Sequence, residues 1–262
     1  MNVFDDMGVY WAEIADQNQT ERQVQFIKKI LKVKGLVLDV ACGTGRHLIP
    51  LGKSGFDIIG LDISLKLLRI AKSRLRDARV VQADMRFLPF KPQAFSAAIS
   101  MDTSFGYLPN EQDDIQSLKA LRETLRQNGV LIVDVFNRHL LIQKYKRKRL
   151  KWVFLPTLMN PNSLAKRLLF LFFKWKEYPS FFLLQKRTVT KKGKELRDLW
   201  TVCDKTDGQL RVFEHVARLY TLSGLKCLLE KAGFKVMETY GDYEKQSLVI
   251  DSSRLIFIAG ST

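Results

Sequence analysis

The sequence is short of several features that would define other protein classes. Only three of its 262 residues are cysteines, at positions 42, 203 and 227. Their spacing matches neither a disulfide framework nor a metal-ligand pattern, so it indicates a reducing compartment and predicts no metal site. No apolar run reaches the roughly 18 to 20 residues that span a bilayer. The acidic start, residues 1–6, lacks the apolar core of a signal peptide. We therefore expect a cytoplasmic protein, at most peripheral to a membrane.

Acidic residues are scarce in one quarter of the chain. Residues 138–200 contain 17 Lys and Arg against three Asp and Glu, whereas the whole chain has a formal charge of +16. Nearly all of the excess positive charge therefore lies in this segment. Because 46% of the residues are hydrophobic, the chain can bury a sizeable core, which favours one large α/β domain carrying an insertion.

Outside the basic segment, short apolar runs alternate with helical patterns. Strands are expected at residues 35–40, 57–62, 79–83, 95–100, 130–136, 235–240 and 254–259. Helices are expected at residues 20–32, 44–54, from 64 onward, 111–126 and 221–232. Because the strands are nearly all apolar and alternate with helices, the pattern predicts a parallel sheet covered on both faces, with helix 20–32 at the sheet edge.

The alternation stops between residues 138 and 220. Residues 138–180 are basic and aromatic, and residues 181–220 are typical of an antiparallel meander with turns at Lys192-Gly193-Lys194 and Asp207-Gly208. We therefore predict one domain formed by residues 1–137 and 221–262, with residues 138–220 inserted as a lid over the substrate.

A glycine loop follows the first expected strand. Asp39-Val40-Ala41-Cys42-Gly43-Thr44-Gly45 opens a helix, and such a loop lets the backbone approach a nucleotide-like ligand beside free helix N–H groups. The third glycine of the dinucleotide fingerprint is absent, and no Gly-Lys-Ser/Thr follows as in a phosphate loop. The loop therefore predicts a nucleotide-like cofactor other than a dinucleotide.

Acidic residues end the next two expected strands. Asp62 lies 17 residues after Gly45, and Asp84 is followed by Met85. A carboxylate at the first position suits the two hydroxyls of an unphosphorylated ribose. A carboxylate beside an apolar side chain suits adenine. Each acid alone is commonly a loop or helix cap, but together with Asp39 they predict one pocket at the carboxyl ends of the strands.

With these pieces in order, the chain resembles the class I S-adenosylmethionine (SAM)-dependent methyltransferases. The matching runs are 37–45, 59–62, 82–85, 95–99, 125–133 and 228–234, and together they fall within residues 35–136 and 221–259. The resemblance implies a Rossmann-like, seven-stranded, mostly parallel sheet with a reversed last hairpin, and SAM as the cofactor. Ala41 departs from the glycine that the family often has at this position.

The resemblance also implies roles for individual residues. Asp39 would organise the loop, Asp62 would bind the ribose, and Asp84 with Met85 the adenine, while Met101 would lie near the methyl donor. The full set of cofactor-binding candidates is Asp39, Ala41, Cys42, Gly43, Gly45, Asp62, Ile63, Asp84, Met85 and Met101.

No single catalytic residue is implied, because methyl transfer depends largely on positioning and needs a base only when the nucleophile must lose a proton. The candidates for such a base are His139, Asp134 and His215, each of which can equally be structural or solvated. The Asp/Asn-Pro-Pro-Tyr/Phe run of amino-directed nucleic-acid methyltransferases is absent after the fourth strand, where residues 101–107 read Met-Asp-Thr-Ser-Phe-Gly-Tyr. Tyr10 and Trp11 can cover the cofactor pocket or pack within the domain.

The basic insertion leaves three alternatives open. Residues 163–176 place Lys and Arg on one side of a helix and Leu, Phe and Trp on the other. The segment can be a lid packed on its own domain, an interfacial helix for an anionic membrane, or an RNA-binding surface. The sequence thus predicts a methyltransferase acting on an O, N or C nucleophile of a small or lipid-like substrate. An RNA methyltransferase and a non-catalytic binding protein are the alternatives, and the oligomeric state stays open.

Overall fold

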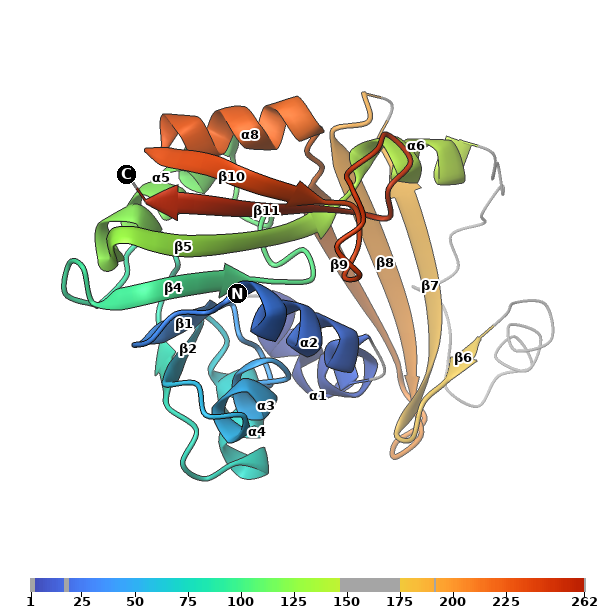
Figure 1. The fold of residues 1–262 in the computed structure, drawn as a ribbon. Coiled ribbons are helices and arrows are strands. Elements are labelled where there is room, and N and C mark those ends of the chain that lie inside the picture. Colours follow the sequence, from blue (N-terminus) through green and yellow to red (C-terminus); the bar gives the residue numbers. More distant parts are fainter. Residues whose placement is uncertain (1–2, 17–18, 147–174, 191, 262) are drawn as a thin grey trace.

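The computed structural model describes residues 3–16, 19–146, 175–190 and 192–261. Two sheets dominate it (Figure 1). The main sheet contains seven strands in the order β10-β11-β5-β4-β1-β2-β3. The inserted sheet contains four strands in the order β6-β7-β8-β9.

The strands of the main sheet are β1 (Val37–Val40), β2 (Ile58–Asp62), β3 (Val80–Gln82), β4 (Phe95–Ser100), β5 (Leu125–Phe136), β10 (Phe234–Tyr240) and β11 (Arg254–Ser261). Strands β1 to β5 are parallel to one another where they pair, whereas β11 runs antiparallel to both β5 and β10. Strands β1 and β4 are buried along their whole length, as expected for a sheet covered on both faces. The predicted fold class is confirmed.

Six helices accompany the main sheet: α1 (Val3–Asp16), α2 (Thr20–Ile30), α3 (Leu48–Lys53), α4 (Leu65–Arg74), α5 (Glu111–Thr124) and α8 (Leu222–Lys231). One core cluster joins the strands to α5 and α8, and a second joins their other side to α2 and α3. Phe26 of α2 also packs edge-on against Tyr240 at the end of edge strand β10. The main sheet is therefore the middle layer of three.

The helix after the glycine loop begins later than the sequence pattern predicts. It starts at Leu48 instead of Thr44, because Gly43 and Gly45 both have left-handed φ angles that an α-helix does not accommodate. The four residues from Thr44 to His47 form turns. They carry the chain from the carboxyl end of β1 to the start of α3.

The insertion after β5 contains α6 (Arg138–Lys146), β6 (Lys176–Glu177), β7 (Phe181–Val189), β8 (Glu195–Asp204) and β9 (Leu210–Arg218). All pairings within the inserted sheet are antiparallel. Its turns contain Gly193 and Gly208 with left-handed φ angles, which confirms the predicted meander and both turns. The basic amphipathic segment 163–176 lies almost wholly outside the described residues, and the boundaries predicted at 137/138 and 220/221 stay a prediction.

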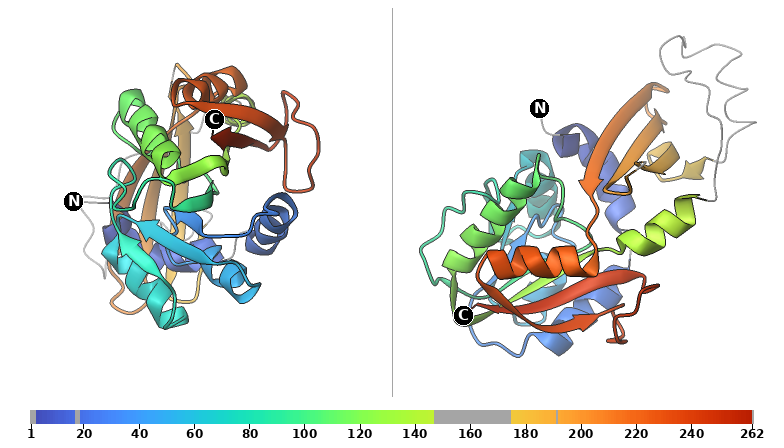
Figure 2. Two further views of the ribbon diagram at one scale, coloured as in Figure 1. Left: turned by 60° about the vertical axis from the view of Figure 1, so that its left-hand side comes forward. Right: turned by 90° about the horizontal axis from the view of Figure 1, so that it is seen from above.

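The two sheets stand at an angle to each other, and the carboxyl ends of β4 and β5 point toward the inserted sheet (Figures 1 and 2). Helix α1 connects the two parts: Met7 and Tyr10 pack with Phe181 and Trp200 of the inserted sheet, and α1 also packs against α4. This arrangement places the inserted sheet opposite the predicted cofactor loop.

Candidate functional site

Left-handed backbone conformations shape the loop between β1 and α3. Gly43 and Gly45 have φ angles of 52° and 76°, and Ala41 has a φ of 55° although it carries a Cβ. The Gly45 N–H donates to the Cys42 carbonyl at 2.9 Å, which closes a tight turn. A small cavity of about 50 Å³, the loop cavity, lies against this turn.

Asp62 is tied into the same loop. Its carboxylate accepts a hydrogen bond from the Gly43 amide and another from the Ser64 amide, both at 2.8 Å. Burial raises the pKa of Asp62, and the two amide hydrogen bonds oppose that shift. The carboxylate is therefore held in one orientation at the wall of a larger cavity.

This second cavity, the strand-end cavity, has a volume of about 630 Å³. Six of the predicted cofactor-binding residues line it: Ala41, Gly43, Asp62, Ile63, Asp84 and Met85. Arg86, which the sequence analysis did not single out, forms an ion pair with Asp84 at 2.7 Å and lowers its pKa. Asp84 thus stays ionised, but a neighbouring side chain already occupies part of its hydrogen-bonding capacity.

The remaining predicted residues lie around the loop cavity, with one exception. Asp39, Cys42 and Met101 line the loop cavity together with Ala41 and Gly43. Gly45 lines neither cavity. A Cβ added to it would lie 3.1 Å from Ile49 and 3.3 Å from Ala71, so this glycine serves close packing between the loop, α3 and α4.

Two polar atoms of the loop cavity are buried without a hydrogen-bond partner. They are Asp39 Oδ2 and Thr44 Oγ1. Because buried polar groups are almost always paired, two orphaned atoms in one cavity indicate that a polar ligand completes the site. Burial raises the pKa of Asp39 to about 7, and a cationic ligand would favour its ionised form. The ammonium and carboxylate groups of SAM's methionine part fit these partners.

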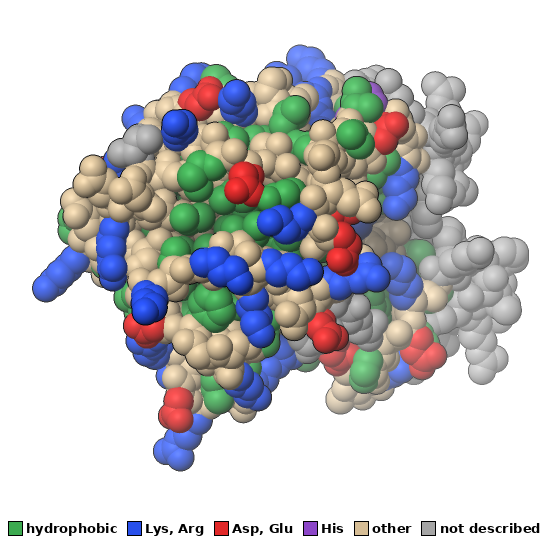
Figure 3. Space-filling view, viewed as in Figure 1, with side chains coloured by type: hydrophobic (Ala, Val, Ile, Leu, Met, Phe, Trp, Pro, Cys, Tyr) green, Lys and Arg blue, Asp and Glu red, His purple; other side chains and the backbone are tan. Residues whose placement is uncertain are grey.

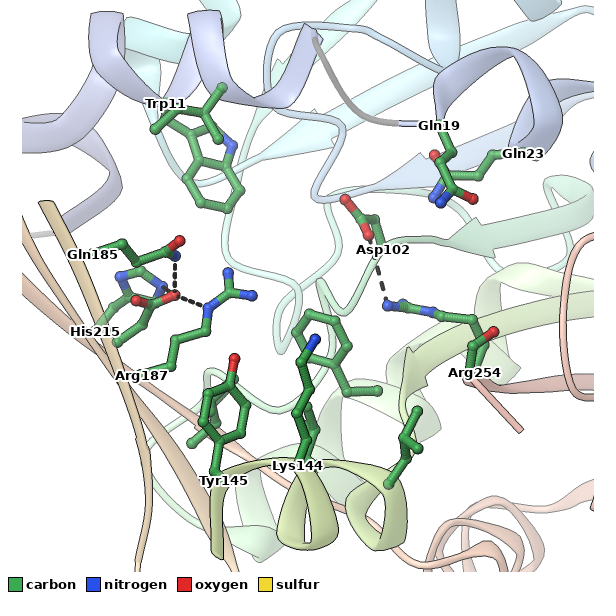
Figure 4. A pocket seen from close by; sticks show the side chains of 18 of the residues that line it. Trp11, Gln19, Gln23, Asp102, Lys144, Tyr145, Gln185, Arg187, His215 and Arg254 are labelled. Carbon is green, nitrogen blue, oxygen red and sulfur yellow. Dashed lines mark hydrogen bonds and ion pairs between the residues drawn. The ribbon is translucent and has the colours of Figure 1, made fainter. Parts of the chain in front are cut away.

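A third cavity, the large cavity, has a volume of about 820 Å³ and lies between the main sheet, α6 and the inserted sheet (Figure 4). Trp11 and Asp102 line this cavity and both of the others. Tyr107 lines the large and the strand-end cavities. The three cavities therefore meet at Trp11 and Asp102. The ring of Trp11 also stacks on that of Trp200, so whether Trp11 covers a bound cofactor stays a prediction.

A buried charge network fixes the wall at this meeting point. Asp102 forms an ion pair with Arg46 at 2.6 Å and lies 3.8 Å from Arg254, whose Nε donates to Asp134 at 2.7 Å. Asp134 also accepts from the Tyr243 hydroxyl at 2.8 Å and the Asp102 amide at 2.9 Å. This network holds the loop after β4, where Asp102 has a left-handed φ of 53°.

The three candidate bases occupy different environments. Asp134 is fully buried in the charge network. His139 lies on α6 with 46% of its side chain exposed, beside Gln143 and Asp251. His215 alone of the three lines the large cavity. Burial lowers the pKa of His215, and the nearby carboxylate of Asp198 opposes that shift.

The inserted sheet contributes polar residues that the sequence analysis did not identify. Asp198 Oδ2 accepts hydrogen bonds from Arg187 Nε at 2.7 Å and Gln185 Nε2 at 2.8 Å, and it lies 3.8 Å from His215 Nε2. These four side chains come from three adjacent strands and face the same cavity (Figure 4). Among the described residues there is no group of three or more His, Cys, Asp or Glu side chains that could hold a metal ion.

Comparison with known proteins agrees with this geometry. Residues 37–129 match a family model described as a methyltransferase domain. This match agrees with the resemblance to class I SAM-dependent methyltransferases found in the sequence. Similar solved structures are described as SAM-dependent or SAM-bound methyltransferases, in agreement with the predicted cofactor.

Individual relatives and structures are similar over different lengths. The chain is 28% identical over 136 residues to the putative methyltransferase YqeM of Bacillus subtilis, covering 51% of this chain and 55% of that protein. It is 36% identical over 147 residues to a glycine/sarcosine N-methyltransferase of Parasynechococcus marenigrum, covering 53% and 52%. The chain thus spans about half the length of these relatives. A crystal structure of a SAM-dependent methyltransferase from Clostridium acetobutylicum superposes with a TM-score of 0.75 at 17% identity, covering 99% of both chains.

Proposed function

We propose that this protein is an enzyme that transfers the methyl group of SAM to an amino group of a polar small molecule held in the large cavity. The observation that carries the proposal is the meeting of three cavities at Trp11 and Asp102. A cofactor in the loop and strand-end cavities would present its reactive end there, next to a space large enough for a small substrate.

The predicted cofactor residues support the first half of the proposal. Asp39 and Thr44 offer unpaired polar atoms for the methionine part of SAM. Asp62 offers an oriented carboxylate for the ribose, and Met85 an apolar surface beside Asp84 for the adenine.

The wall of the large cavity supports a polar substrate over a lipid. Charged side chains line it from both sheets, with basic and acidic residues in similar number: Arg22, Lys144, Lys176, Arg187, Arg254, Asp102, Asp198, Asp242 and Glu244. An acyl chain would displace water from these charged groups without offering them hydrogen bonds. An amine can donate to a carboxylate such as that of Asp102, and a related protein is named a glycine/sarcosine N-methyltransferase.

The described part of the chain supports membrane binding and RNA binding less than it supports a small-molecule substrate. On the face shown in Figure 3, Lys and Arg side chains form a row with acidic side chains among them. No helix within the described ranges is long and apolar enough to cross a membrane. Peripheral membrane binding and RNA binding by residues 138–220 stay predictions that liposome flotation and an RNA gel shift, each run across salt, would separate.

The release of S-adenosylhomocysteine (SAH), measured by mass spectrometry, tests the proposal. The protein would be given SAM with a panel of amines, such as glycine, sarcosine and amino sugars, and with glycolate, in which a hydroxyl replaces the amine of glycine. We expect SAH to form with at least one amine and faster than with glycolate. SAH formation no faster with any amine than without substrate would contradict the amine assignment.

A further inference from the structure

Three buried polar atoms without partners gather on one wall of the large cavity. They are Asp198 Oδ1, Trp200 Nε1 and His215 Nδ1. Asp198 and His215 face each other in the β8–β9 register, and Trp200 is two residues further along β8. The three residues are 1%, 6% and 1% exposed, in the order Asp198, His215 and Trp200. Because unpaired buried polar groups are rare, an acceptor, a donor and an imidazole without partners on one wall indicate a binding site for a group that both donates and accepts hydrogen bonds.

The imidazole of His215 lies close to the meeting point of the three cavities. Its ring centroid is 5.4 Å from that of Trp200, 5.8 Å from that of Tyr107 and 6.2 Å from that of Trp11. Tyr107 and Trp11 also line the strand-end cavity. The rings of Tyr107 and Trp11 therefore lie between His215 and the strand-end cavity, which is assigned to the cofactor.

Asp198 places a carboxylate beside the imidazole. Its Oδ2, held by Arg187 and Gln185, lies 3.8 Å from His215 Nε2, whereas His215 Nδ1 has no partner. A carboxylate on one side of the ring stabilises the imidazolium that forms when the other nitrogen takes a proton. The pair therefore combines a carboxylate beside one ring nitrogen with a second nitrogen that is available to a ligand.

We propose that Asp198 and His215 hold the substrate's amino group, that the Trp200 N–H donates to another polar group of the substrate, and that His215 Nδ1 accepts the amine's proton during methyl transfer. This inference rests on the proposed function and deepens it. It makes the inserted sheet, in addition to the cofactor pocket, part of the reacting centre.

The proposed step balances in atoms and electrons. The amine nitrogen uses its lone pair to bond to the methyl carbon, and the carbon–sulfur bond breaks with its electron pair left on sulfur, which yields SAH. The N–H proton of the new ammonium passes to His215 Nδ1, and Asp198 stabilises the resulting imidazolium until the proton leaves to water. The Trp200 N–H is free to donate to a polar group of the substrate.

Several groups act on the charge of the imidazole. Asp198 on β8 and Glu214 on β9 favour the protonated form of His215, whereas Arg187 on β7 and burial oppose it. Tyr107 faces the ring from the loop after β4, and α1 presents only aromatic rings to it. A cationic sulfonium next to the ring would add one more opposing charge.

The effect of the sulfonium charge on His215 can be tested without a substrate, because SAM carries this charge and SAH lacks it. The chain has three histidines, so their NMR signals can be assigned with single His→Gln variants and titrated in the SAM and SAH complexes. We expect the His215 pKa to be about one unit lower with SAM than with SAH. An equal His215 pKa in the two complexes would overturn the inference while leaving the proposed function intact. Failure to bind SAM would overturn both.

Sinefungin, which carries an amino group where SAM carries its methyl group, tests the acceptor directly. We expect the protein to bind sinefungin about tenfold more tightly than SAH, because the amino group reaches the Asp198–His215 pair. Asp198→Asn should lose this preference. Asp207→Asn, in the exposed β8–β9 turn, should keep it. No preference in the wild type, or the same preference in Asp198→Asn, would contradict the inference.

Discussion

The main sheet and the inserted sheet contribute to the site in different ways. In the main sheet, polar residues follow successive parallel strands, so their order in the chain repeats their order in space: the loop after β1, Asp62 after β2, and Asp84 after β3. In the inserted sheet, Asp198 and His215 are 17 residues apart and meet only because the β8–β9 register places them opposite each other.

This difference indicates a division of labour. The cofactor side is built from loops, whose backbone geometry is fixed by left-handed residues and a buried charge network. The proposed substrate side is built from side chains on the strand faces of the inserted sheet. Under the proposed function, changes in these side chains would alter substrate choice while leaving the proposed cofactor pocket in place.

Replacing Asp134 tests the view that the main-sheet network is structural. Asp134→Ala leaves Arg254 buried without its closest partner and removes the acceptor of Tyr243. We expect the free energy of unfolding to fall by about 3 to 5 kcal/mol, measured by urea denaturation. Asp77→Ala, at an exposed position, should change it by less than about 0.5 kcal/mol. A loss below about 1 kcal/mol in Asp134→Ala would return Asp134 to the candidate bases.

Replacing Trp11 tests whether α1 joins the two regions. The Trp11 ring stacks on Trp200 of the inserted sheet, with centroids 5.5 Å apart, and lines all three cavities. Because it is only partly buried, we expect Trp11→Ala to lower the free energy of unfolding by about 2 to 3 kcal/mol and to weaken SAM binding as well. Val9→Ala, at a position 62% exposed on the same helix, is the control. Equal effects of the two variants would show that α1 does not join the regions.

The pH dependence of SAM binding tests whether Asp39 in the loop cavity binds the ammonium group of SAM. Because burial raises the pKa of Asp39 to about 7, its carboxyl group is protonated in the free protein below that pH and must lose a proton to meet the ammonium of SAM. We expect affinity to fall as the pH drops below 7, by up to about tenfold per unit, measured by calorimetry from pH 5.5 to 8.5. Asp39→Asn should flatten this profile, and an unchanged slope in that variant would exclude Asp39 as the cause.

His139→Gln should have the smallest effect. Its side chain is half exposed and lies beside Gln143 and Asp251. Stability should change by less than about 0.5 kcal/mol, and SAM affinity by less than about twofold, measured by thermal unfolding and calorimetry. A larger loss would mean that α6 contributes to the cofactor side.

The sequence predicted the main sheet and most of the residues around two of its cavities because both depend on local patterns. Nine of the ten predicted residues line the loop or strand-end cavity, since each follows an apolar strand whose end the pattern locates. The start of α3 was wrong because the left-handed glycines delay the helix.

The substrate side was harder to predict because its chemistry depends on register and on distant partners. Asp198 carries no motif, and only its pairing with His215 gives it a role. Arg187 is one of many basic residues in its segment, and its pairing with Asp198 distinguishes it. Asp102 lies in residues 101–107, which the sequence analysis discussed because they lack the Asp/Asn-Pro-Pro-Tyr/Phe run. Its position where the three cavities meet depends on the fold of the loop after β4.

Calorimetry of SAM binding tests the central claim most directly, because that claim is that Asp62 and the glycine loop hold the cofactor. The account predicts that one SAM binds per chain. Asp62→Ala should weaken binding at least about 30-fold, through loss of a carboxylate that accepts two charge-assisted hydrogen bonds. Asp77→Ala should bind as the wild type does. No binding by the wild type, or equal affinity in Asp62→Ala, would contradict the account.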